Sequence, residues 1–556
     1  MKNKYDFYAQ HMHIHSCYEP GASMEGHIYH AKNLGMKYIW FTDHDIRMGR
    51  KPEEIDSFDF NSGLSLLDSG KKEYGFKCEN AEYGSVEHCR DTAYEGDGCM
   101  KMQVKANGED WHGIEATLFS TGKKHCTSLL SDVSISFAYK TDFQDSENQR
   151  LIFDVMLSER PPELTCAHIL YVLGSTEGLE ENHTLIIPIS GSRDWTHRIF
   201  NLSEDADSAY GGVDNVFATV TVRLEARRQK SAVAFIDSFR KTVDLSAQQT
   251  HDRQKRIAAQ IGEKYGVVPF VATEVSAAGM HKNCFSTRIP ILDYEAKGYD
   301  VSNAEACRIL LSEGAAFSLN HPFVRYKRRD CSQLDIGAEV NSIAQFFLDN
   351  NCFGATLLDV GYPDGRHHIP QCGYTKLWDK LSLGGYFLTG YGCSDSHSLN
   401  NGWYSGNNFA TWLGIPSGEA PDEDKFISAM KSGIAYTADP VVFSGDISFE
   451  TEDGAPMGSV CITSSERVEK ICFRADKIKR GSTLNWIVNG EKEKEITLTQ
   501  DAVSSEIEIT VSLPVSFARV EVYDENKRLL LLTNPIYFVR EDLTDLKIPK
   551  ERAFRL

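Results

Sequence analysis

Five short motifs of histidine, carboxylate and other polar residues follow one another along the chain and could perform metal chemistry. They are His13-Ile14-His15, Thr42-Asp43-His44-Asp45, Glu274, Asn320-His321-Pro322 and Ser394-Asp395-Ser396-His397. Imidazole nitrogens and carboxylate oxygens are ligands by which proteins bind Zn, Mn and Fe. A single His-x-His is a weak signal, because alternate residues of any strand share a face. The five motifs together predict a metal site.

The elements that position these motifs are predicted to be β-strands. Apolar stretches at residues 38–41, 267–271 and 315–319 come shortly before Asp43, Glu274 and His321, respectively. Polar groups at the ends of successive strands can converge on one point, as they do at the mouth of a β/α barrel. We therefore expect strand ends to bring the five motifs together.

The motif set resembles the PHP (polymerase and histidinol phosphatase) family of metal-dependent hydrolases, and most of all its CehA/McbA-type members. The matched positions are His13, His15, Asp43, His44, Glu274, His321, Asp395 and His397. The tail motif Thr533-Asn534-Pro535-Ile536-Tyr537 is similar to one in the β-rich tail of that group. The resemblance covers about residues 8–56 and 246–440, and more loosely the tail. It implies a distorted seven-stranded β/α barrel with two or three divalent ions of Zn, Mn or Fe.

The resemblance also implies a role for each matched residue. The implied ligands of a first ion are His13, His15, Glu274 and Asp395. Glu274 would bridge to a second ion bound by His321. His44 and His397 would hold a third ion or act as catalytic proton donors or substrate ligands. Asp43 would orient an imidazole.

The sequence departs from the family pattern near the first and fourth motifs. His11 stands where the family usually has Asp, and we expect it to be structural. Pro20, with Glu19 beside it, stands where an acidic residue or histidine is frequent. Asp359, at the end of an apolar stretch, is the best candidate for a further ligand of the second ion. Glu19 and Asp359 therefore join the predicted metal ligands.

Several basic residues near the motifs could bind a substrate. The run Arg325-Tyr326-Lys327-Arg328-Arg329 follows His321, and Arg47 follows His44. Arginine makes bidentate contacts with phosphate, so Arg325, Arg328 and Arg47 are candidate substrate ligands. The alternative is that these side chains form a solvated surface. For Arg366-His367-His368, function and surface remain equally open.

For other histidine and tryptophan residues, we expect roles other than metal binding. His281, seven residues after Glu274, is expected to line the pocket and contact substrate rather than bind an ion. His27 and His30 are expected on the surface of the first helix. Trp111 and Trp195 could stack on a sugar, but aromatic residues in β-sandwiches usually belong to the core.

Composition narrows the class of protein. The 556 residues exceed what one hydrophobic core normally serves, so two to four domains are expected. The formal charge of −20 disfavours nucleic acid and anionic membranes as partners. No signal sequence or stretch of about 18 apolar residues is evident, so a cytoplasmic location and free cysteine thiols are expected.

The spacing of the motifs predicts an inserted domain. Roughly 190 residues beyond the family norm separate the second motif from Glu274, and their apolar residues alternate with period two, as in Met100, Met102 and Val104. We expect a β-sandwich of the jelly-roll kind whose first and last strands pair. It would grow from a loop on the face of the metal site and flank or roof that site. The expected segments are 1–56 (barrel), 57–245 (inserted sandwich), 246–440 (barrel) and 441–556 (C-terminal β-sandwich). The pattern of residues 247–265 is helical, and Asn489-Gly490 predicts a hairpin turn in the last segment.

Three functions remain open from the sequence. The first is a metal-dependent phosphoesterase, either a phosphatase or a phosphodiesterase, acting on a small and perhaps sugar-containing phosphate ester. The second is a metallohydrolase of a carboxyl ester, amide or carbamate. The third is a binding module that retains metal without turnover. A small-molecule substrate is the expected partner, carbohydrate is a possible one, and the oligomeric state stays open.

Overall fold

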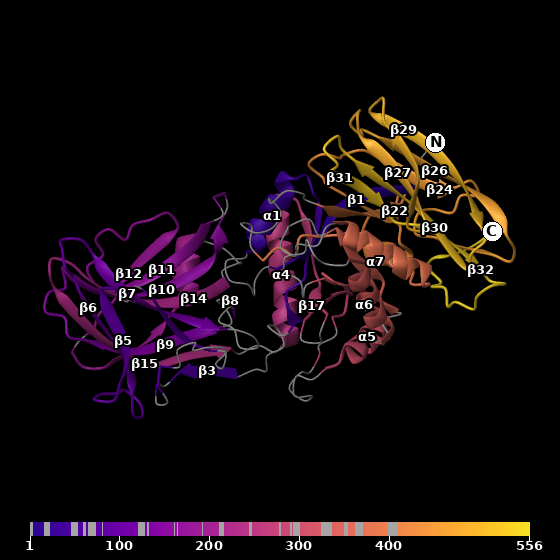
Figure 1. Ribbon diagram of the computed structural model, residues 1–556. Helices are drawn as coiled ribbons and strands as arrows, with labels where there is room; N and C mark the ends of the chain where they lie inside the picture. Colours follow the sequence, from indigo (N-terminus) through magenta and orange to yellow (C-terminus); the bar gives the residue numbers. More distant parts are fainter. Residues whose placement is uncertain are drawn as a thin grey trace.

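The computed structural model describes most of the chain, in several β-sheets with a smaller share of helix (Figure 1). The residues outside this description are 1–3, 16–22, 46–53, 59, 61–62, 65–73, 80–81, 121–127, 130–132, 161, 164, 192, 211–215, 244–246, 277–279, 290–291, 293–300, 324–335, 350–353, 362–370 and 398–408. The expectation of a β-rich chain with several sheets is confirmed.

Two sheets of an α/β region carry the five motifs. The first contains β16 (Val268–Val271), β2 (Tyr38–Phe41), β1 (Tyr5–Ile14), β22 (Ala410–Pro416) and β23 (Ala435–Ala438), in that order. The second contains β17 (Thr273–Val275), β18 (Lys282–Phe285), β19 (Ala316–Leu319), β20 (Leu357–Gly361) and β21 (Thr389–Gly392). Parallel bridges His44↔Glu274 and Ile14↔Ser396 lie where the motifs of both sheets meet.

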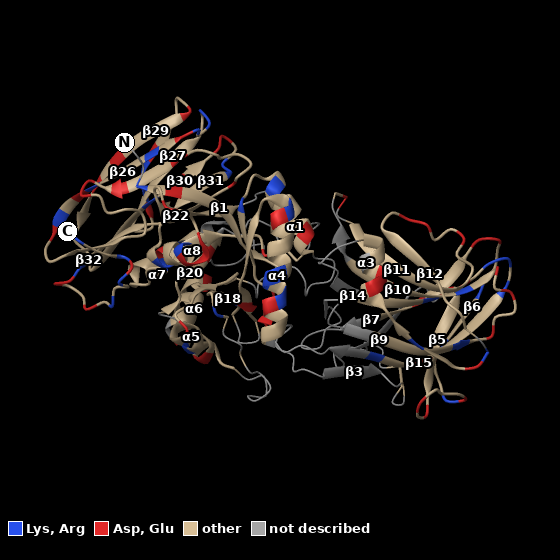
Figure 2. Ribbon diagram, turned by 180° about the vertical axis from the view of Figure 1, so that it is seen from behind, with Lys and Arg blue, Asp and Glu red and all other residues tan. Residues whose placement is uncertain are grey.

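Helices accompany these sheets. They are α1 (Met24–Asn33), α4 (Ala247–Tyr265), α5 (Asn303–Ser312), α6 (Ile336–Asp349), α7 (Gln371–Leu383) and α8 (Glu423–Ser432). Side-chain oxygens of Ser23, Ser302 and Asp422 cap the N-termini of α1, α5 and α8. Figure 2 shows acidic and basic residues interspersed along α1 and α4. No helix in the described part of the chain is both long and apolar enough to cross a membrane.

The strands between residues 54 and 243 form two sheets around a core of their own. One sheet contains β12 (Thr184–Pro188), β11 (Thr165–Gly174), β10 (Gln149–Arg160), β14 (Val216–Ala226), β7 (His112–Ser120), β4 (Tyr74–Glu79) and β8 (Ser128–Leu129). The other contains β13 (Thr196–Phe200), β9 (Val133–Thr141), β15 (Ser231–Val243), β6 (Cys99–Lys105), β5 (Gly84–Cys89) and β3 (Glu54–Phe58). The helix α3 (Leu202–Tyr210) belongs to the same lobe.

This lobe has the predicted pairing of its ends. β3, the first strand, pairs antiparallel with β15, the last, so that Glu54 lies opposite Val243. The alternating residues Met100, Met102 and Val104 are buried in the core that both sheets share. In Figure 1 the lobe lies beside α1 and α4, and α1 contacts β10.

The C-terminal strands continue the first α/β sheet. They add β31 (Leu529–Thr533), β30 (Val515–Tyr523), β32 (Ile536–Arg540), β25 (Val460–Thr463), β33 (Ala553–Arg555), β27 (Thr483–Val488) and β28 (Glu491–Thr497). A separate three-stranded sheet contains β24 (Ile447–Thr451), β26 (Arg467–Asp476) and β29 (Ala502–Val511). The expected hairpin at Asn489-Gly490 is confirmed, and both residues have the positive φ of a tight hairpin turn.

Two buried contacts fasten this tail to the α/β region. Asn534 of the tail motif accepts a hydrogen bond from the Gly390 N–H at 2.7 Å and donates to the Ala435 carbonyl oxygen at 2.7 Å. The Arg519 guanidinium of β30 makes a bidentate contact with Asp379 of α7, at 2.9 and 2.8 Å. The tail thus holds β21 and α7 close to the strand ends that carry the site.

Candidate metal centre

The five motifs lie on or just after β1, β2, β17, β19 and β21 and meet in one buried place. His13 lies near the end of β1, and His15 follows that strand directly. The Asp395 N–H donates to the His13 carbonyl oxygen at 3.1 Å, and the His15 N–H donates to the Ser396 carbonyl oxygen at 2.9 Å. The Glu274 N–H donates to the Asp43 carbonyl oxygen at 2.9 Å. Backbone hydrogen bonds therefore set the relative positions of motifs that are far apart in the sequence.

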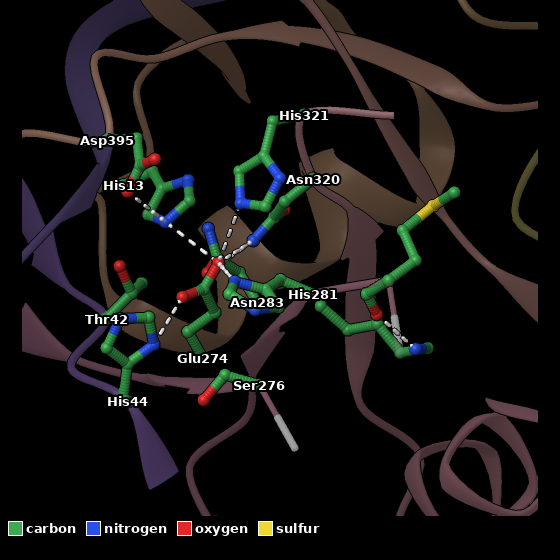
Figure 3. A network of polar contacts seen from close by, with 12 residues as sticks. His13, Thr42, His44, Glu274, Ser276, His281, Asn283, Asn320, His321 and Asp395 are labelled. Atoms are coloured by element: carbon green, nitrogen blue, oxygen red, sulfur yellow. Dashed lines mark hydrogen bonds and ion pairs between the residues drawn. The ribbon is translucent and has the colours of Figure 1, made fainter. Parts of the chain in front are cut away.

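Glu274 is the centre of the cluster, and its two carboxylate oxygens face different imidazoles (Figure 3). Distances of 3.3, 3.2 and 3.4 Å separate Oε1 from His13 Nε2, His281 Nδ1 and His321 Nε2. Distances of 2.7 and 3.7 Å separate Oε2 from His44 Nδ1 and His15 Nε2. The side chain of Glu274 is fully buried. A carboxylate with ligand groups on both oxygens suits a bridge between two ions.

Asp395 is the second carboxylate of the cluster. Its Oδ1 lies 3.3 Å from His13 Nε2, 3.0 Å from His15 Nε2 and 3.6 Å from His397 Nδ1. The backbone of Asp395 has a φ of 50°, which L-residues rarely adopt. His321 also has a positive φ, of 29°. Such strained backbone gathers at functional sites, where surrounding contacts hold a side chain in place.

Among the residues that the structure describes, three groups of side chains have donor atoms close enough to share an ion. The groups are His13, His15 and Glu274; His44, Glu274 and His281; and His15, His44 and His397. Ligand atoms about 2.1 Å from one ion lie roughly 3.0–3.4 Å from one another in octahedral or tetrahedral geometry. The separations around Glu274 and Asp395 mostly fall in or near this range. The residues present therefore fit divalent metal ions.

The protonation states of the cluster also suit metal binding. Burial raises the pKa of Glu274, but the charges of His281, His44 and His13 outweigh it and bring that pKa well below its usual value. Burial likewise raises the pKa of Asp395. The charges of His13 and His397 outweigh this effect and bring the pKa well below its usual value. Burial and the neighbouring imidazoles lower the pKa of His15. Ionised carboxylates beside neutral imidazole are the forms that bind metal.

His13 differs from His15 because two carboxylates outweigh its burial. Burial lowers the pKa of His13, but the charges of Asp395 and Glu274 raise it above its usual value. The space between these carboxylates thus favours positive charge, and a divalent ion supplies more of it than one proton.

His281 lies closer to the cluster than its predicted role as a pocket-lining substrate contact requires. Its Nδ1 is one of three donor atoms grouped with Glu274 and His44, which makes it a candidate metal ligand. It directly precedes β18, whose Asn283 lies opposite Glu274 in the antiparallel pair. The antiparallel pairing of β17 with β18 brings back a histidine only seven residues further on. An antiparallel pair of strands recognised at residues 273–285 would have placed His281 beside Glu274 from the sequence.

Asp43 and Asp359 lie around the cluster and have hydrogen-bond partners on the protein. Asp43 Oδ2 accepts a hydrogen bond from the Gln254 side chain of α4. Asp359 Oδ2 accepts one from the His321 N–H at 3.2 Å, and the Asp359 side chain is fully buried. Both carboxylates therefore hold neighbouring elements in place. The described contact of Asp359 supports the backbone of His321, and its predicted metal binding stays a prediction.

Four predicted site residues lie outside the described part of the chain. They are Glu19, Arg47, Arg325 and Arg328, and the run Arg366-His367-His368 lies outside it as well. Their predicted roles stay predictions.

The expected surface positions of His27 and His30 are wrong. Both side chains are buried, with relative exposures of 0% and 3%. Burial and, for His27, the charge of His30 lower the pKa values to about 3 and about 4, respectively. His11 is buried nearby, as expected of a structural residue.

The two tryptophans of the lobe contact cationic side chains. The guanidinium carbons of Arg150 and Arg227 lie 4.0 and 4.7 Å from the centroid of the Trp111 ring. The Lys140 ammonium lies 5.2 Å from the Trp195 ring centroid. Part of the aromatic surface of each ring is thus used by a contact within the protein. The cysteines whose side chains are described, including Cys393 beside His13, are free thiols.

Comparison with known proteins identifies no family. No protein-family model matches the chain, and no curated protein matches it. Among solved structures, similarity is found to carbohydrate-binding modules of the β-sandwich superfamily, at 13% identity and a TM-score of 0.21, over 34% of this chain and 61% of that one. The chain thus spans less than two thirds of that structure.

Two further solved structures give comparable values. The xylan-binding domain of Paenibacillus barcinonensis Xyn10C is 12% identical with a TM-score of 0.20, over 36% of this chain and 99% of that one. The Endo-D glycoside hydrolase domain of Streptococcus pneumoniae R6 is 8% identical with a TM-score of 0.21, over 88% of this chain and 44% of that one. Similarities at these scores carry no conclusion about function, which therefore rests on the geometry of the site.

Proposed function

We propose that the protein is a metal-dependent hydrolase of phosphate esters, built on a distorted β/α barrel of the PHP type. The observation that carries this proposal is the position of Glu274, whose Oε1 and Oε2 face separate sets of imidazole nitrogens. That arrangement supports a bridged pair of ions. Bound in this way, divalent ions would activate water and polarise a phosphoryl oxygen.

The side chains of the cluster would have two different roles, ion binding and contact with the substrate. His13, His15, Glu274 and Asp395 are fully or almost fully buried and would hold ions away from bulk water. His397 is 36% exposed, and its Nδ1 donates to the Asp395 carbonyl oxygen at 2.9 Å. That hydrogen bond leaves Nε2 for an ion, a substrate oxygen or the proton that the leaving group requires.

Phosphate is the favoured electrophile because of the charges that follow the fourth motif. Four basic residues lie within eight positions after His321. A phosphate ester carries negative charge that the ions neutralise only in part, and arginine recognises such groups with two parallel hydrogen bonds. Activity on a carboxyl ester or carbamate would instead require little cationic surface.

The proposal is tested by hydrolysis assays on protein that has been loaded with Zn or Mn. A panel of phosphomonoesters, phosphodiesters and carboxyl esters should show turnover of phosphate esters that a chelator abolishes. His13→Ala should lower kcat/KM at least about a hundredfold, since several kcal/mol of charge stabilisation depend on the ions.

His168→Ala provides the matched control. His168 lies in the lobe, where its Nδ1 is 2.8 Å from Asp154 Oδ1, so this variant also removes an imidazole from a carboxylate. Its activity should equal that of the unmodified protein. Turnover of carboxyl esters or carbamates alone would contradict phosphate-ester hydrolysis, and equal losses in both variants would contradict the assigned site.

A further inference from the structure

Asn320, the first residue of the fourth motif, has a fully buried side chain with four hydrogen bonds. Figure 3 shows this side chain beside Glu274. Its Nδ2 donates to Glu274 Oε1 at 2.8 Å and to Asn283 Oδ1 at 3.0 Å. Its Oδ1 accepts from the Tyr391 hydroxyl at 2.7 Å and from the Ser318 hydroxyl. A carboxamide offers two N–H donors and two acceptor lone pairs, so its capacity is fully used.

The partners fix which way the amide points. The Ser318 oxygen accepts a hydrogen bond from the Asn283 N–H at 3.0 Å, which leaves the Ser318 hydrogen for Asn320 Oδ1. With two hydroxyl groups directed at the oxygen, the amide nitrogen must face Glu274. A flipped amide would bring its oxygen against a buried carboxylate, and both hydroxyl groups would lose an acceptor.

Neighbouring strands supply this arrangement. Glu274 and Asn283 lie directly opposite each other on β17 and β18, where side chains of a pair share one face. β18 pairs in turn with β19, which carries Ser318 and leads directly to Asn320. Tyr391 comes from β21. The amide is thus held by the sheet itself, which is more rigid than a loop.

We propose that Asn320 is a positioning residue that fixes the Glu274 carboxylate in the orientation that binds metal. This inference rests on the site of the proposed function. The hydrogen bond occupies one lone pair of Oε1 and prevents rotation of the carboxylate, while the other lone pairs stay directed at the imidazole sets. A neutral amide performs this task without adding a positive charge that would compete with the ions, as lysine or arginine would.

The test is metal binding by Asn320→Asp, a nearly isosteric change that places a second carboxylate against Glu274. Isothermal titration of metal-free protein with Zn or Mn should show affinity at least about tenfold weaker, the range measured when groups that orient metal ligands are removed. Tyr391→Phe removes only one hydroxyl and should weaken affinity several-fold with the fold intact. This milder variant decides the matter if Asn320→Asp does not fold.

Asn148→Asp is the matched control. Asn148 is buried in the lobe and donates to Asp145 Oδ2 at 2.9 Å, so the change again sets two carboxylates together, but far along the chain from the cluster. Its metal affinity should be unchanged. Folded Asn320→Asp and Tyr391→Phe proteins that bind metal within twofold of the unmodified chain would overturn the inference. Because binding is read directly, the result is independent of whether phosphate esters are the substrates.

Discussion

Glu274 connects more members of the candidate centre than any other described side chain, since five imidazole nitrogens lie within 3.7 Å of its two oxygens. Glu274→Gln keeps the shape of the side chain and removes its charge. We expect this variant to lose at least one ion per chain, as measured by elemental analysis after loading with Zn or Mn. Glu423→Gln, at the start of α8, is the control and should keep its ions. Equal metal content in both variants would contradict the bridging role.

His251 allows a test of pH dependence away from the cluster. Its side chain on α4 is buried, and burial together with the charge of Lys255 lowers its pKa from 6.5 to about 4. The unfolded chain then binds more protons than the folded chain between these values, so stability is full above about pH 6.5 and falls as the pH drops towards 4.

His251→Met should remove this part of the acid sensitivity. The difference in unfolding free energy between pH 7 and 4.5 should shrink by roughly 2 kcal/mol, as measured by urea unfolding at both pH values. His197→Met, at an exposed position of the lobe, serves as the control. An unchanged difference in the His251 variant would show that this imidazole is not held neutral by the fold.

The site residues that belong to sequence motifs were predictable, because their residue types and spacing are typical of metal ligands. The motifs at His13, Glu274 and Asp395 converge as expected, because strand ends set their positions. The proximity of His281 was not foreseen, since it depends on a short antiparallel return. Neither were the partners of Asn320, because a buried amide network is formed by strands that are distant in the sequence.

At the level of elements, α7 and β30 are joined by a charge pair removed from water. The side chains of Arg519 and Asp379 are only 2% and 10% exposed, and Arg519 also contacts Glu521. Asp379→Asn removes one charge and leaves the guanidinium undercompensated. We expect a loss of about 3 kcal/mol in unfolding free energy, measured by urea unfolding.

An exposed ion pair in the tail serves as the control for the buried Arg519–Asp379 pair. Lys479 and Glu525 are 71% and 62% exposed, so Lys479→Met should leave the unfolding midpoint unchanged. If both variants shift the midpoint equally, burial does not explain the importance of the Arg519 pair.

Strands and helices with a strong local pattern were predicted well. The helix over residues 247–265 and the hairpin at Asn489-Gly490 are found as expected. The surroundings of α1 were not predictable, because α4 and β10, which cover it, come from more than a hundred residues away. Its histidines therefore looked exposed in the sequence although they are buried. The direct continuation of the α/β sheet into the tail through β23 and β31 was likewise a long-range pairing.

For the whole molecule, the lobe of residues 54–243 can be removed as a unit because its ends pair. Glu54 and Val243 lie opposite each other, so a short Gly/Ser linker can replace the lobe. Since the motifs lie outside the deletion, metal content should stay nearly intact. Hydrolysis of 4-nitrophenyl phosphate should persist or increase, whereas preference among larger sugar phosphates should change if the lobe restricts access.

Two results would contradict this role of the lobe. Loss of the ions would show that the lobe contributes to the metal site. Dissociation of an oligomer with unchanged substrate preference, measured by light scattering and the same assays, would assign it to assembly instead.

The metal content of the intact chain tests the central claim most directly. Protein purified after growth with ample Zn and Mn should contain at least two ions per chain by elemental analysis, because Glu274 presents each of its oxygens to a different set of ligands. Less than one ion per chain would contradict a multinuclear centre and, with it, the proposed hydrolase.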